Sequence, residues 1–391
     1  MPHRILVVDD EPDLETLVLQ RFRKRIRSEE LSFLFAGNGE EALAKAAVEP
    51  GVDVVLTDIN MPVMDGLTLL SNLRQAHPLV RSVVVSAYGD MQNIRTALNR
   101  GAFDFVTKPI DFADLEVTLD KAIGESILYK QAARDRDLLL GMHRELDLAR
   151  GMQESLVPSK YPVHARFEVH GAMIPALHVG GDLFDFFLLE DGRLAFSIGD
   201  VSGKGIAAGL FMAVSRTLLR VSGGQMLPPN EVLTEMNRFL CHEKTTHLYL
   251  TCFYATLDLN TGVVEYSRAA HNSPYLVRAK LDASGKRVEE LAAGGGLPLS
   301  LFDFATYETT TVKMEQGDCL VMFTDGVTEA MNYDHECYGE ERLVPLLELQ
   351  TASVPVQEIV KAVVDGAQTF ASGAPPSDDI TVLAIRYLGS N

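Results

Sequence analysis

The sequence predicts an α/β doubly wound domain with a five-stranded parallel sheet, a helical coiled-coil linker, and an α+β domain built as a β-sandwich flanked by helices. Three observations predict this order. Strand patterns alternate with helical patterns in residues 1–120, a heptad repeat fills residues 121–158, and strands and helices come in blocks in residues 159–391. A chain of 391 residues also exceeds the usual size of one domain.

The first domain is predicted from five short runs of mainly apolar residues, a pattern typical of strands that are buried on both faces of a parallel sheet. These runs are residues 4–8, 31–36, 53–57, 82–85 and 104–107. Helical patterns lie between them, at residues 12–28, 40–48, 67–76 and 93–99. Such alternation of strands and helices indicates a doubly wound sheet.

The linker is predicted from residues that recur at alternating steps of four and three. These positions are Leu128, Ala132, Asp135, Leu139, Met142, Leu146, Ala149, Gln153 and Leu156. Seven of these nine are apolar, which indicates a coiled-coil seam and predicts a parallel homodimer. The alternative is a long helix that folds back on its own domain. Val157 and Pro158 end the helical pattern.

In the third segment, strand patterns at residues 248–259 and 263–269 flank Asn260-Thr261-Gly262, which predicts a β-hairpin. Further strand patterns are at residues 194–198, 319–323 and 380–385. Helical patterns are at residues 207–221, 229–241 and 356–370. Because the strands and helices come in blocks, an α+β sandwich is expected.

The composition argues against several functional classes. The formal net charge of −19 disfavours nucleic acid or an anionic membrane surface as the main partner. The four cysteines form no CxxC pair, so reduced thiols are expected rather than a disulfide or a zinc site. We find no signal-peptide pattern and no run of about 20 apolar residues, so a soluble cytoplasmic protein is expected.

Chemically useful side chains follow the strands of the predicted parallel sheet. They are Asp9 and Asp10 after the first strand, Asp58 after the third, Ser86 after the fourth and Lys108 after the fifth. Ligands bind at the carboxyl ends of the strands in such a sheet. Three carboxylates gathered there repel one another unless a hard cation such as Mg²⁺ lies among them. With a lysine and a hydroxyl opposite, the pattern predicts transfer of phosphate onto one carboxylate.

This domain resembles the response-regulator receiver family over residues 3–120. The matching motifs are VVDDE (7–11), LTDINMPVMDG (56–66), VVSAYGD (84–90) and GAFDFVTKPID (101–111). The resemblance implies that Asp58 accepts phosphate from a histidine kinase, and that Ser86 and Lys108 contact the phosphoryl group. It also implies an aromatic switch at Phe105 and a Mg²⁺ site. The implied Mg²⁺ ligands are Asp9, Asp10, Asp58 and the carbonyl of Asn60.

The third segment carries a second set of acids in turns flanked by glycine or serine, each next to an apolar strand. They are Asp182, Asp200, Asp325 and the adjacent pair Asp378 and Asp379. In such turns the backbone approaches a metal closely and its carbonyls stay free. The segment has no cluster of Cys or His, so the acids favour Mg²⁺ or Mn²⁺ over zinc. Two such ions activate a water and bind a phosphoryl oxygen.

This segment resembles the metal-dependent (PPM-type) serine/threonine phosphatases, in their SpoIIE-like branch, over residues 149–388. The matching motifs are ARGMQESLVP (149–158), VGGDLFDF (179–186), GDVSGKGIAAGLFM (199–212), AAHNSP (269–274), GLPLSL (296–301), FTDGVTEA (323–330) and SDDITVLAIR (377–386). The resemblance implies two Mn²⁺ or Mg²⁺ ions and direct attack of an activated water on phosphoserine or phosphothreonine. The implied ligands are Asp182, Asp200, Asp325, Asp378 and the carbonyl of Val201. Asp379 either replaces or supplements Asp378.

Other residues of these motifs have less defined roles. Asp185 lies in the first motif and is expected to support a ligand rather than to bind metal itself. His271 is expected to be a buried structural histidine. The Gly203-Lys204-Gly205 turn is not a nucleotide-binding loop, because the full GxxxxGK[ST] pattern is absent.

Together, the two resemblances predict a two-component response regulator in which phosphorylation of Asp58 controls a metal-dependent protein serine/threonine phosphatase. The implied partners are a histidine kinase and a phosphorylated protein substrate, for which an anti-sigma-factor antagonist is expected. The alternative is a non-catalytic adaptor that binds and sequesters a regulatory protein. A transcription factor is disfavoured, because the acidic C-terminal half offers no basic DNA-reading domain.

Overall fold

The computed structural model describes residues 2–48, 51–87, 90–242 and 247–389. The chain forms two compact units, residues 1–142 and 143–391. One helix, α6 (Phe112–Leu156), contributes residues to both units without a break. The predicted domain limits at residues 120 and 158 therefore stay a prediction.

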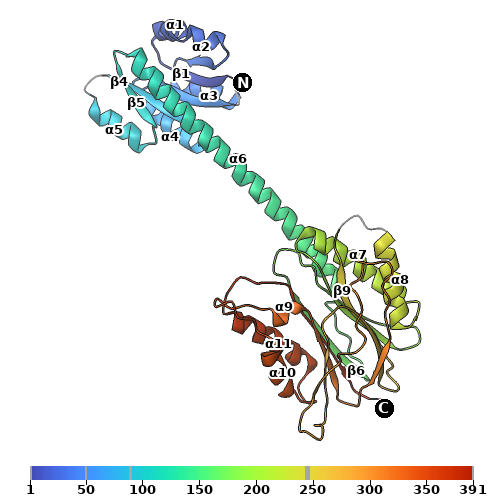
Figure 1. The fold of residues 1–391 in the computed structure, drawn as a ribbon. Coiled ribbons are helices and arrows are strands. Elements are labelled where there is room, and N and C mark those ends of the chain that lie inside the picture. Colours follow the sequence, from blue (N-terminus) through green and yellow to red (C-terminus); the bar gives the residue numbers. More distant parts are fainter. Residues whose placement is uncertain (1, 49–50, 88–89, 243–246, 390–391) are drawn as a thin grey trace. The chain divides into compact units, whose positions relative to one another are not determined.

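The first unit is a parallel five-stranded sheet with helices on both faces, as predicted (Figure 1). In sheet order, its strands are β2 (Leu31–Ala36), β1 (His3–Val8), β3 (Val52–Asp58), β4 (Arg81–Ala87) and β5 (Asp104–Lys108). Its helices are α1 (Pro12–Arg21), α2 (Arg23–Arg27), α3 (Gly39–Val48), α4 (Gly66–Ala76), α5 (Met91–Asn99) and the first part of α6. Ile5 and Val7 pack with α1 and α6, whereas Leu6 and Val8 pack with α3 and α4. Both faces of β1 are therefore buried, as its apolar run predicts.

The single helix predicted over residues 12–28 is wrong, because the structure has two helices that are separated at Phe22. The backbone there leaves the helical region, with φ −90° and ψ 10°. The Phe22 side chain is buried, and its ring centroid lies 5.3 Å from that of Phe33 on β2. This tertiary contact has no counterpart in the local apolar periodicity, which continues through the break.

Along α6, the heptad seam is exposed over its middle part. The side chains of Leu128, Leu139 and Met142 are 66%, 57% and 54% exposed. This exposure disfavours the alternative in which the helix folds back on its own domain. An exposed apolar seam is what a parallel coiled coil requires, and the homodimer stays a prediction.

The second unit is an antiparallel β-sandwich with helices on both outer faces, as predicted (Figure 1). In order, one sheet contains β13 (Thr310–Lys313), β10 (Val263–Ala269), β9 (Leu250–Leu257), β8 (Leu194–Val201) and β7 (Leu183–Leu188). The other contains β12 (Val288–Glu290), β11 (Tyr275–Val277), β14 (Cys319–Phe323), β15 (Ile380–Tyr387) and β6 (Phe167–Ile174). The helices are α7 (Ile206–Gly223), α8 (Pro229–His242), α9 (Asp325–Thr328), α10 (Glu340–Glu348) and α11 (Val356–Ala371).

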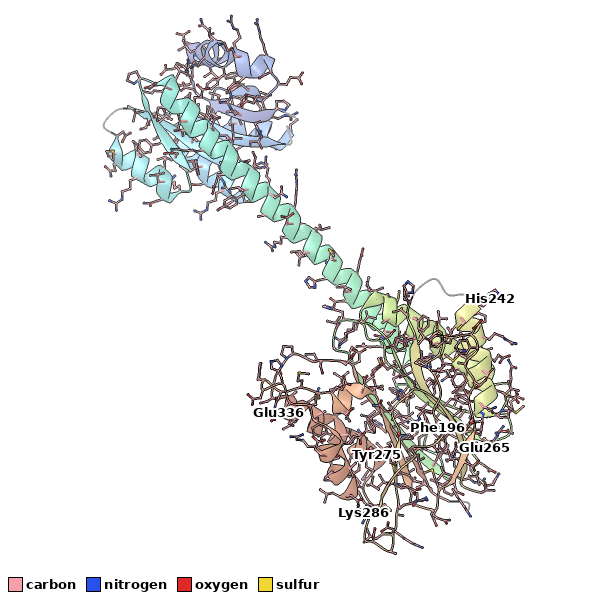
Figure 2. All side chains as sticks on the ribbon, viewed as in Figure 1. Phe196, His242, Glu265, Tyr275, Lys286 and Glu336 are labelled. Carbon is pink, nitrogen blue, oxygen red and sulfur yellow. The ribbon has the colours of Figure 1, made fainter. Side chains whose placement is uncertain are left out.

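Large apolar side chains fill the space between the two sheets. Phe196, labelled in Figure 2, packs there with Phe184 and Phe253 from one sheet and with Leu320 and Leu383 from the other. Helices α7 and α8 cover the outer face of the first sheet, and α10 and α11 cover that of the second. The predicted β9–β10 hairpin is confirmed. The sequence analysis missed the strand β6, the short strands β11, β12 and β13, and the helices α9 and α10.

Among the described helices, α7 is long and apolar enough to cross a membrane by length and composition. Its Ala208, Met212 and Leu219 are buried in one cluster with residues of α8 and β9. One face of α7 is therefore part of the core, whereas Ile206, Leu210, Val214 and Val221 of the same helix are exposed.

Candidate functional site

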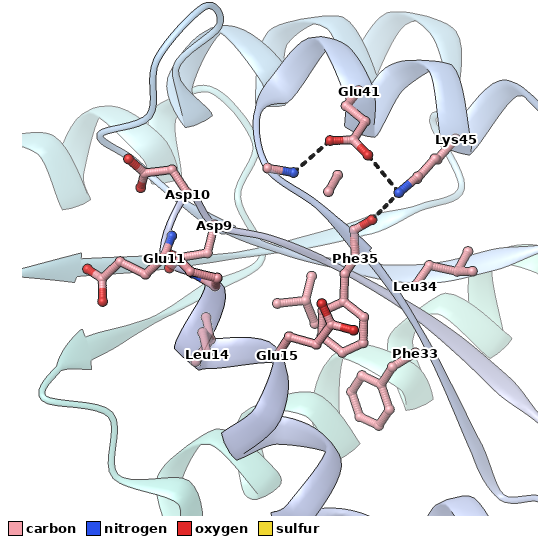
Figure 3. Close-up of a pocket in the computed structure, with 14 residues that line it drawn as sticks. Asp9, Asp10, Glu11, Leu14, Glu15, Phe33, Leu34, Phe35, Glu41 and Lys45 are labelled. Carbon is pink, nitrogen blue, oxygen red and sulfur yellow. Dashed lines mark hydrogen bonds and ion pairs between the residues drawn. The ribbon is translucent and has the colours of Figure 1, made fainter.

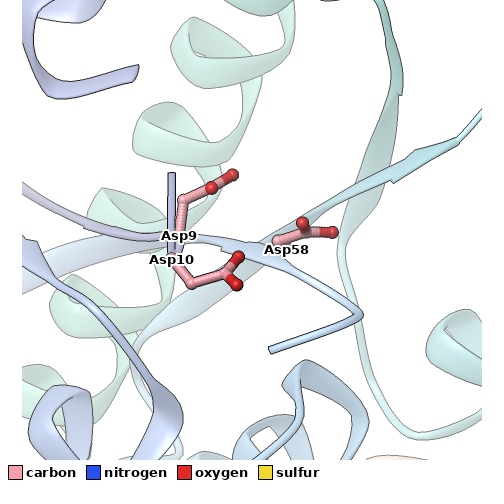
Figure 4. A group of neighbouring side chains, drawn as sticks. All are labelled: Asp9, Asp10 and Asp58. Atoms are coloured by element: carbon pink, nitrogen blue, oxygen red, sulfur yellow. The ribbon is translucent and has the colours of Figure 1, made fainter. Parts of the chain in front are cut away.

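Three carboxylates meet at the carboxyl end of the parallel sheet. Asp9 and Asp10 follow β1, and Asp58 ends the neighbouring strand β3. One oxygen from each of the three lies within 4.8 Å of the others (Figure 4). Burial raises the pKa of Asp9, although hydrogen bonds from Glu11 N–H and Lys108 oppose that rise. Carboxylates this close repel one another and favour a cation among them, and an all-oxygen donor set suits Mg²⁺.

Lys108 adds a positive charge to this cluster. Its Nζ lies 2.9 Å from Asp58 Oδ2 and 3.1 Å from Asp9 Oδ2. Burial disfavours the charged amine, but the hydrogen bonds with these two carboxylates prevail and raise the pKa of Lys108. Ser86, near the end of β4, has a buried hydroxyl with no hydrogen-bond partner among the described residues. A phosphoryl group on Asp58 would offer oxygens to both donors.

A cavity of about 520 Å³ opens beside this cluster, over β1 and β2 and between α1 and α3 (Figure 3). Asp9 and Asp10 line it, together with the ring of Phe35. An ion pair between Lys45 Nζ and Glu41 Oε1, 2.7 Å apart, lies at its edge. Because Asp10 is exposed, a hydrated cation can reach the carboxylates from this side.

The other predicted residues of the first site lie nearby but make fewer contacts. Phe105 on β5 is half-buried and packs against a cluster that contains Ile59, the residue after Asp58. The role of Phe105 as a switch stays a prediction. Asn60 is exposed, and the metal-binding role of its carbonyl stays a prediction.

The structure also brings the second set of acids together. Asp182 precedes β7, Asp200 lies near the end of β8, Asp325 begins α9, and Asp378 precedes β15. The buried Asp182 accepts a hydrogen bond from Thr324 Oγ1 at 2.7 Å. The Val201 carbonyl faces the same loop, because a Cβ on Gly181 would come within 2.8 Å of its oxygen. The described residues contain no second carboxylate trio as close as the first, so this set surrounds a wider space.

Burial, and after it the charges of neighbouring acids, raises the pKa of three of these acids. Burial, followed by the charges of Asp325 and Asp378, raises the pKa of Asp200 to about 7. Burial and the charge of Asp200 raise the pKa of Asp182. Burial, followed by Glu329, raises the pKa of Asp325. Carboxylates that repel one another favour binding of divalent cations, and their oxygen-only character fits Mg²⁺ or Mn²⁺.

The geometry separates the adjacent acids Asp378 and Asp379. Asp379 is buried, and its two oxygens accept hydrogen bonds from Ala176 N at 2.7 Å and Gly181 N at 2.6 Å. Asp378 is half-buried, and its Oδ2 lies 3.1 Å from Lys204 Nζ. Asp378 is therefore the better placed of the two to bind metal, while Asp379 fixes the loop before Asp182. That assignment stays a prediction.

The sequence analysis did not place Lys204 at the second set of acids. The sequence pattern excludes a nucleotide-binding loop at its turn and indicates no other role for it. In the structure, Lys204 Nζ donates to the Ser377 carbonyl and pairs with Asp378. Gly203 and Gly205 flank it with φ of +87° and +81°, a conformation that favours glycine. A lysine between two glycines, four residues after Asp200, was the available signal.

Asp185 supports the site through α7. It is fully buried, and its oxygens accept hydrogen bonds from Arg220 Nη2 at 2.7 Å and Nε at 2.5 Å. Arg216 Nη2 lies 3.2 Å from the same carboxylate. With its oxygens occupied by arginines, Asp185 holds α7 against β7, three residues after Asp182.

His271 is buried behind the second set of acids, as expected for a structural histidine. Its Nδ1 lies 2.9 Å from the hydroxyl of Thr251, the residue that pairs with Asp200 between β9 and β8. Burial, followed by the nearby Arg268, lowers the pKa of His271 to about 3. The folded protein therefore keeps this ring neutral at pH values where the unfolded chain protonates it.

This neutral histidine predicts acid sensitivity. As the pH falls from about 6.5 towards 3, the group should remove about 1.4 kcal/mol of stability per pH unit. In His271→Gln, the loss of stability between pH 7 and pH 5 should be smaller than in the wild type. Urea unfolding monitored by circular dichroism at both pH values measures this difference. Equal losses in the two proteins would contradict the prediction.

Gly326 allows the turn after Asp325 to approach the Asp378–Asp379 turn. A Cβ at this position would lie 2.0 Å from the Asp379 carbonyl oxygen. Gly326→Ala is therefore expected to cost about 1–3 kcal/mol or more in unfolding free energy, since the backbone must shift. The matched control is Gly151→Ala on α6, where a Cβ meets nothing within 4 Å and helix propensity predicts a small gain. Equal stability of both variants in urea unfolding curves would contradict the requirement for glycine at position 326.

Comparison with known proteins gives two family matches. Residues 5–120 match the model of the response regulator receiver domain, and residues 190–388 match that of Stage II sporulation protein E (SpoIIE).

Two relatives and one solved structure extend these matches. Phosphoserine phosphatase RsbU of Bacillus subtilis is 26% identical over 278 residues, which are 70% of this chain and 79% of RsbU. Protein IcfG of Synechocystis is 28% identical over 274 residues, 63% of this chain but less than half of IcfG, at 42%. The SiaA-PP2C domain of Pseudomonas aeruginosa superposes with a TM-score of 0.55 at 20% identity, covering 64% of this chain and 98% of that domain. The second unit therefore has a PP2C-type fold.

Proposed function

Because the chain belongs to the SpoIIE family and carries a response regulator receiver domain, we propose that it is a phosphorylation-controlled, metal-dependent protein serine/threonine phosphatase. The observation that carries this proposal is the presence of two complete acid sets in one chain. Asp9, Asp10 and Asp58 form the receiving set. Asp200 and its acidic neighbours form the hydrolytic set.

The proposed roles rest on the family resemblance, and the positions of the residues in the structure support them. In the receiver, Asp58 is the phosphoacceptor, Lys108 and Ser86 bind the phosphoryl oxygens, and the neighbouring acids hold Mg²⁺. In the second unit, the ligands of two Mn²⁺ or Mg²⁺ ions are Asp182, Asp200, Asp325, Asp378 and the carbonyl of Val201. Bound there, the ions would lower the pKa of a water and neutralise charge on the phosphoryl group.

The partners belong to this proposal. A histidine kinase is the phosphodonor for Asp58, and a phosphoserine or phosphothreonine protein is the substrate. The similarity to RsbU, which is named a phosphoserine phosphatase, supports the substrate class. We propose an anti-sigma-factor antagonist as that substrate, a cytoplasmic location, and a homodimer formed through the exposed seam of α6.

The direct test is hydrolysis of a phosphoserine-bearing anti-sigma-factor antagonist by the full chain, in Mn²⁺ and in EDTA. Phosphate release that requires Mn²⁺ is expected. No release from this substrate or from an aryl phosphate, with or without an Asp58 phosphate mimic, would overturn the proposal. The adaptor alternative predicts binding of the phosphoprotein without release, and an Asp325→Ala variant that behaves like the wild type.

A further inference from the structure

The loop that carries Asp182 is held from two sides. It joins β6, which ends at Ile174, to β7, which begins at Leu183. Both glycines before Asp182 are buried and tightly surrounded. A Cβ on Gly180 would lie 2.5 Å from Asp379 Oδ2, and one on Gly181 would lie 2.8 Å from the Val201 carbonyl oxygen. The path of this loop therefore sets where the Asp182 carboxylate lies.

One side of the loop is held by Asp379, as described above. The other is held by Gln153, near the end of α6. Gln153 Nε2 donates to the Gly180 carbonyl at 2.7 Å, and Gln153 Oε1 accepts from Gly180 N–H at 3.0 Å. A single side-chain amide thus satisfies both backbone groups of the Gly180 residue, which is buried.

Gln153 differs from its surroundings on the helix. It is 5% exposed, whereas the preceding Met152 is 71% exposed. A second contact joins the same stretch of α6 to the loop, since the rings of His143 and His178 lie 5.9 Å apart. In the heptad pattern, Gln153 is a polar residue at a seam position. In the structure, its side chain instead binds the Gly180 backbone.

We propose that Gln153 is a positioning residue that sets the divalent-cation affinity of the second unit by fixing the Gly180 peptide, and that α6 acts on the metal site through this contact. The inference deepens the proposed function and rests on it. Because α6 is one unbroken helix from Phe112 to Leu156, a shift or rotation of its last turns moves the amide that holds Gly180. Asp182 is two residues further along the chain.

The chemistry of the amide defines the test variants. Gln153→Leu keeps the approximate size but removes both hydrogen bonds. Gln153→Glu keeps an acceptor for Gly180 N–H and loses the donor to the Gly180 carbonyl. Gln131→Leu, an exposed glutamine on the same helix, is the matched control.

Titration of the full chain with Mn²⁺ by calorimetry, without substrate, measures the affinity directly. Gln153→Leu is expected to weaken Mn²⁺ binding by roughly 10- to 100-fold, the range seen when a partner that orients a ligand is removed. Gln153→Glu should also bind more weakly than the wild type, and Gln131→Leu should match the wild type. With saturating Mn²⁺, the kcat of Gln153→Leu should return to within about threefold of the wild type, which a general folding defect would not allow.

The proposed action of α6 on the metal site is tested by measuring Mn²⁺ affinity with and without beryllofluoride. Beryllofluoride on the receiver should change the Mn²⁺ affinity of the wild type and of Gln131→Leu, and should leave that of Gln153→Leu unchanged. Wild-type Mn²⁺ affinity in both Gln153 variants would overturn the positioning role. A beryllofluoride effect that persists in Gln153→Leu, or is absent from the wild type, would overturn transmission through this contact. Since the Mn²⁺ affinities are measured without substrate, a failure of the proposed phosphatase activity remains distinguishable from either result.

Discussion

Asp200→Asn is expected to reduce phosphatase turnover on the order of 10³-fold or more, beyond the roughly 10- to 100-fold cost of losing a partner that only orients a ligand. The charges of Asp325 and Asp378 act on Asp200, and in the proposed function its carboxylate is a ligand of the cations that the set binds. Rates on a phosphoprotein across a Mn²⁺ titration measure the effect. The loss should persist at the highest Mn²⁺ concentration.

The same substitution should stabilise the metal-free protein at pH 8. The pKa of Asp200 is raised from 3.8 to about 7, so its ionisation costs stability as the pH rises through that window. Asparagine removes this cost, on the order of 1–3 kcal/mol when one pKa unit is about 1.4 kcal/mol. In EDTA, the variant should therefore unfold at higher urea than the wild type at pH 8, with little difference at pH 4.

Asp318→Asn is the control for this prediction. Asp318 is also buried in the second unit, but it accepts hydrogen bonds from Arg278 Nη1 at 3.0 Å and from Ala279 N at 2.8 Å. Its loss should lower stability at pH 8 and leave the Mn²⁺ dependence unchanged. If Asp200→Asn retained wild-type turnover, or lost stability as Asp318→Asn does, Asp200 would not belong to a metal site.

Asp58→Asn is expected to abolish phosphorylation of the receiver by a small-molecule phosphodonor in Mg²⁺. The amide cannot form the acyl phosphate, and it removes the charge that pairs with Lys108 at 2.9 Å. Phosphate incorporation per chain, measured by gel-shift with a phosphate-binding ligand, should fall from near stoichiometric to background.

Asp53→Asn, on the same strand β3, is the matched control for Asp58. Asp53 is also buried, but its Oδ1 lies 2.5 Å from Lys130 Nζ and its Oδ2 accepts from Arg4 N at 2.9 Å. This variant should be less stable and still accept phosphate. Labelling of Asp58→Asn at the wild-type level would move the phosphoacceptor to another residue.

Much of the fold could be predicted because local sequence and tertiary environment agree. The strands of the receiver are buried on both faces, so their apolar runs are visible without any alignment, and the acids follow at the strand ends. The break at Phe22 could not be predicted, because it depends on a contact with Phe33 on another element. The short strands β11 to β13 give too few residues for a period to be recognised.

The residues of the candidate site could be predicted as a set, but the role of each residue within the set could not. Adjacent residues of an extended chain point to opposite sides, so the sequence shows that Asp378 and Asp379 differ but not which faces the acids. Hydrogen bonds from Ala176 and Gly181 to Asp379 favour Asp378 as the metal ligand, and they join residues about 200 positions apart. The contact of Gln153 with Gly180 could not be predicted from the sequence either, because it joins two different elements of the chain.

The most direct test of phosphorylation control is the phosphatase rate of the full chain with and without beryllofluoride, measured in parallel on Asp58→Asn. In the wild type, beryllofluoride should change the Mn²⁺-dependent rate on the phosphoprotein substrate severalfold. In Asp58→Asn, the rate should be the same in both conditions. A wild-type rate that beryllofluoride leaves unchanged, or a change that persists in Asp58→Asn, would contradict control of the second unit by the receiver.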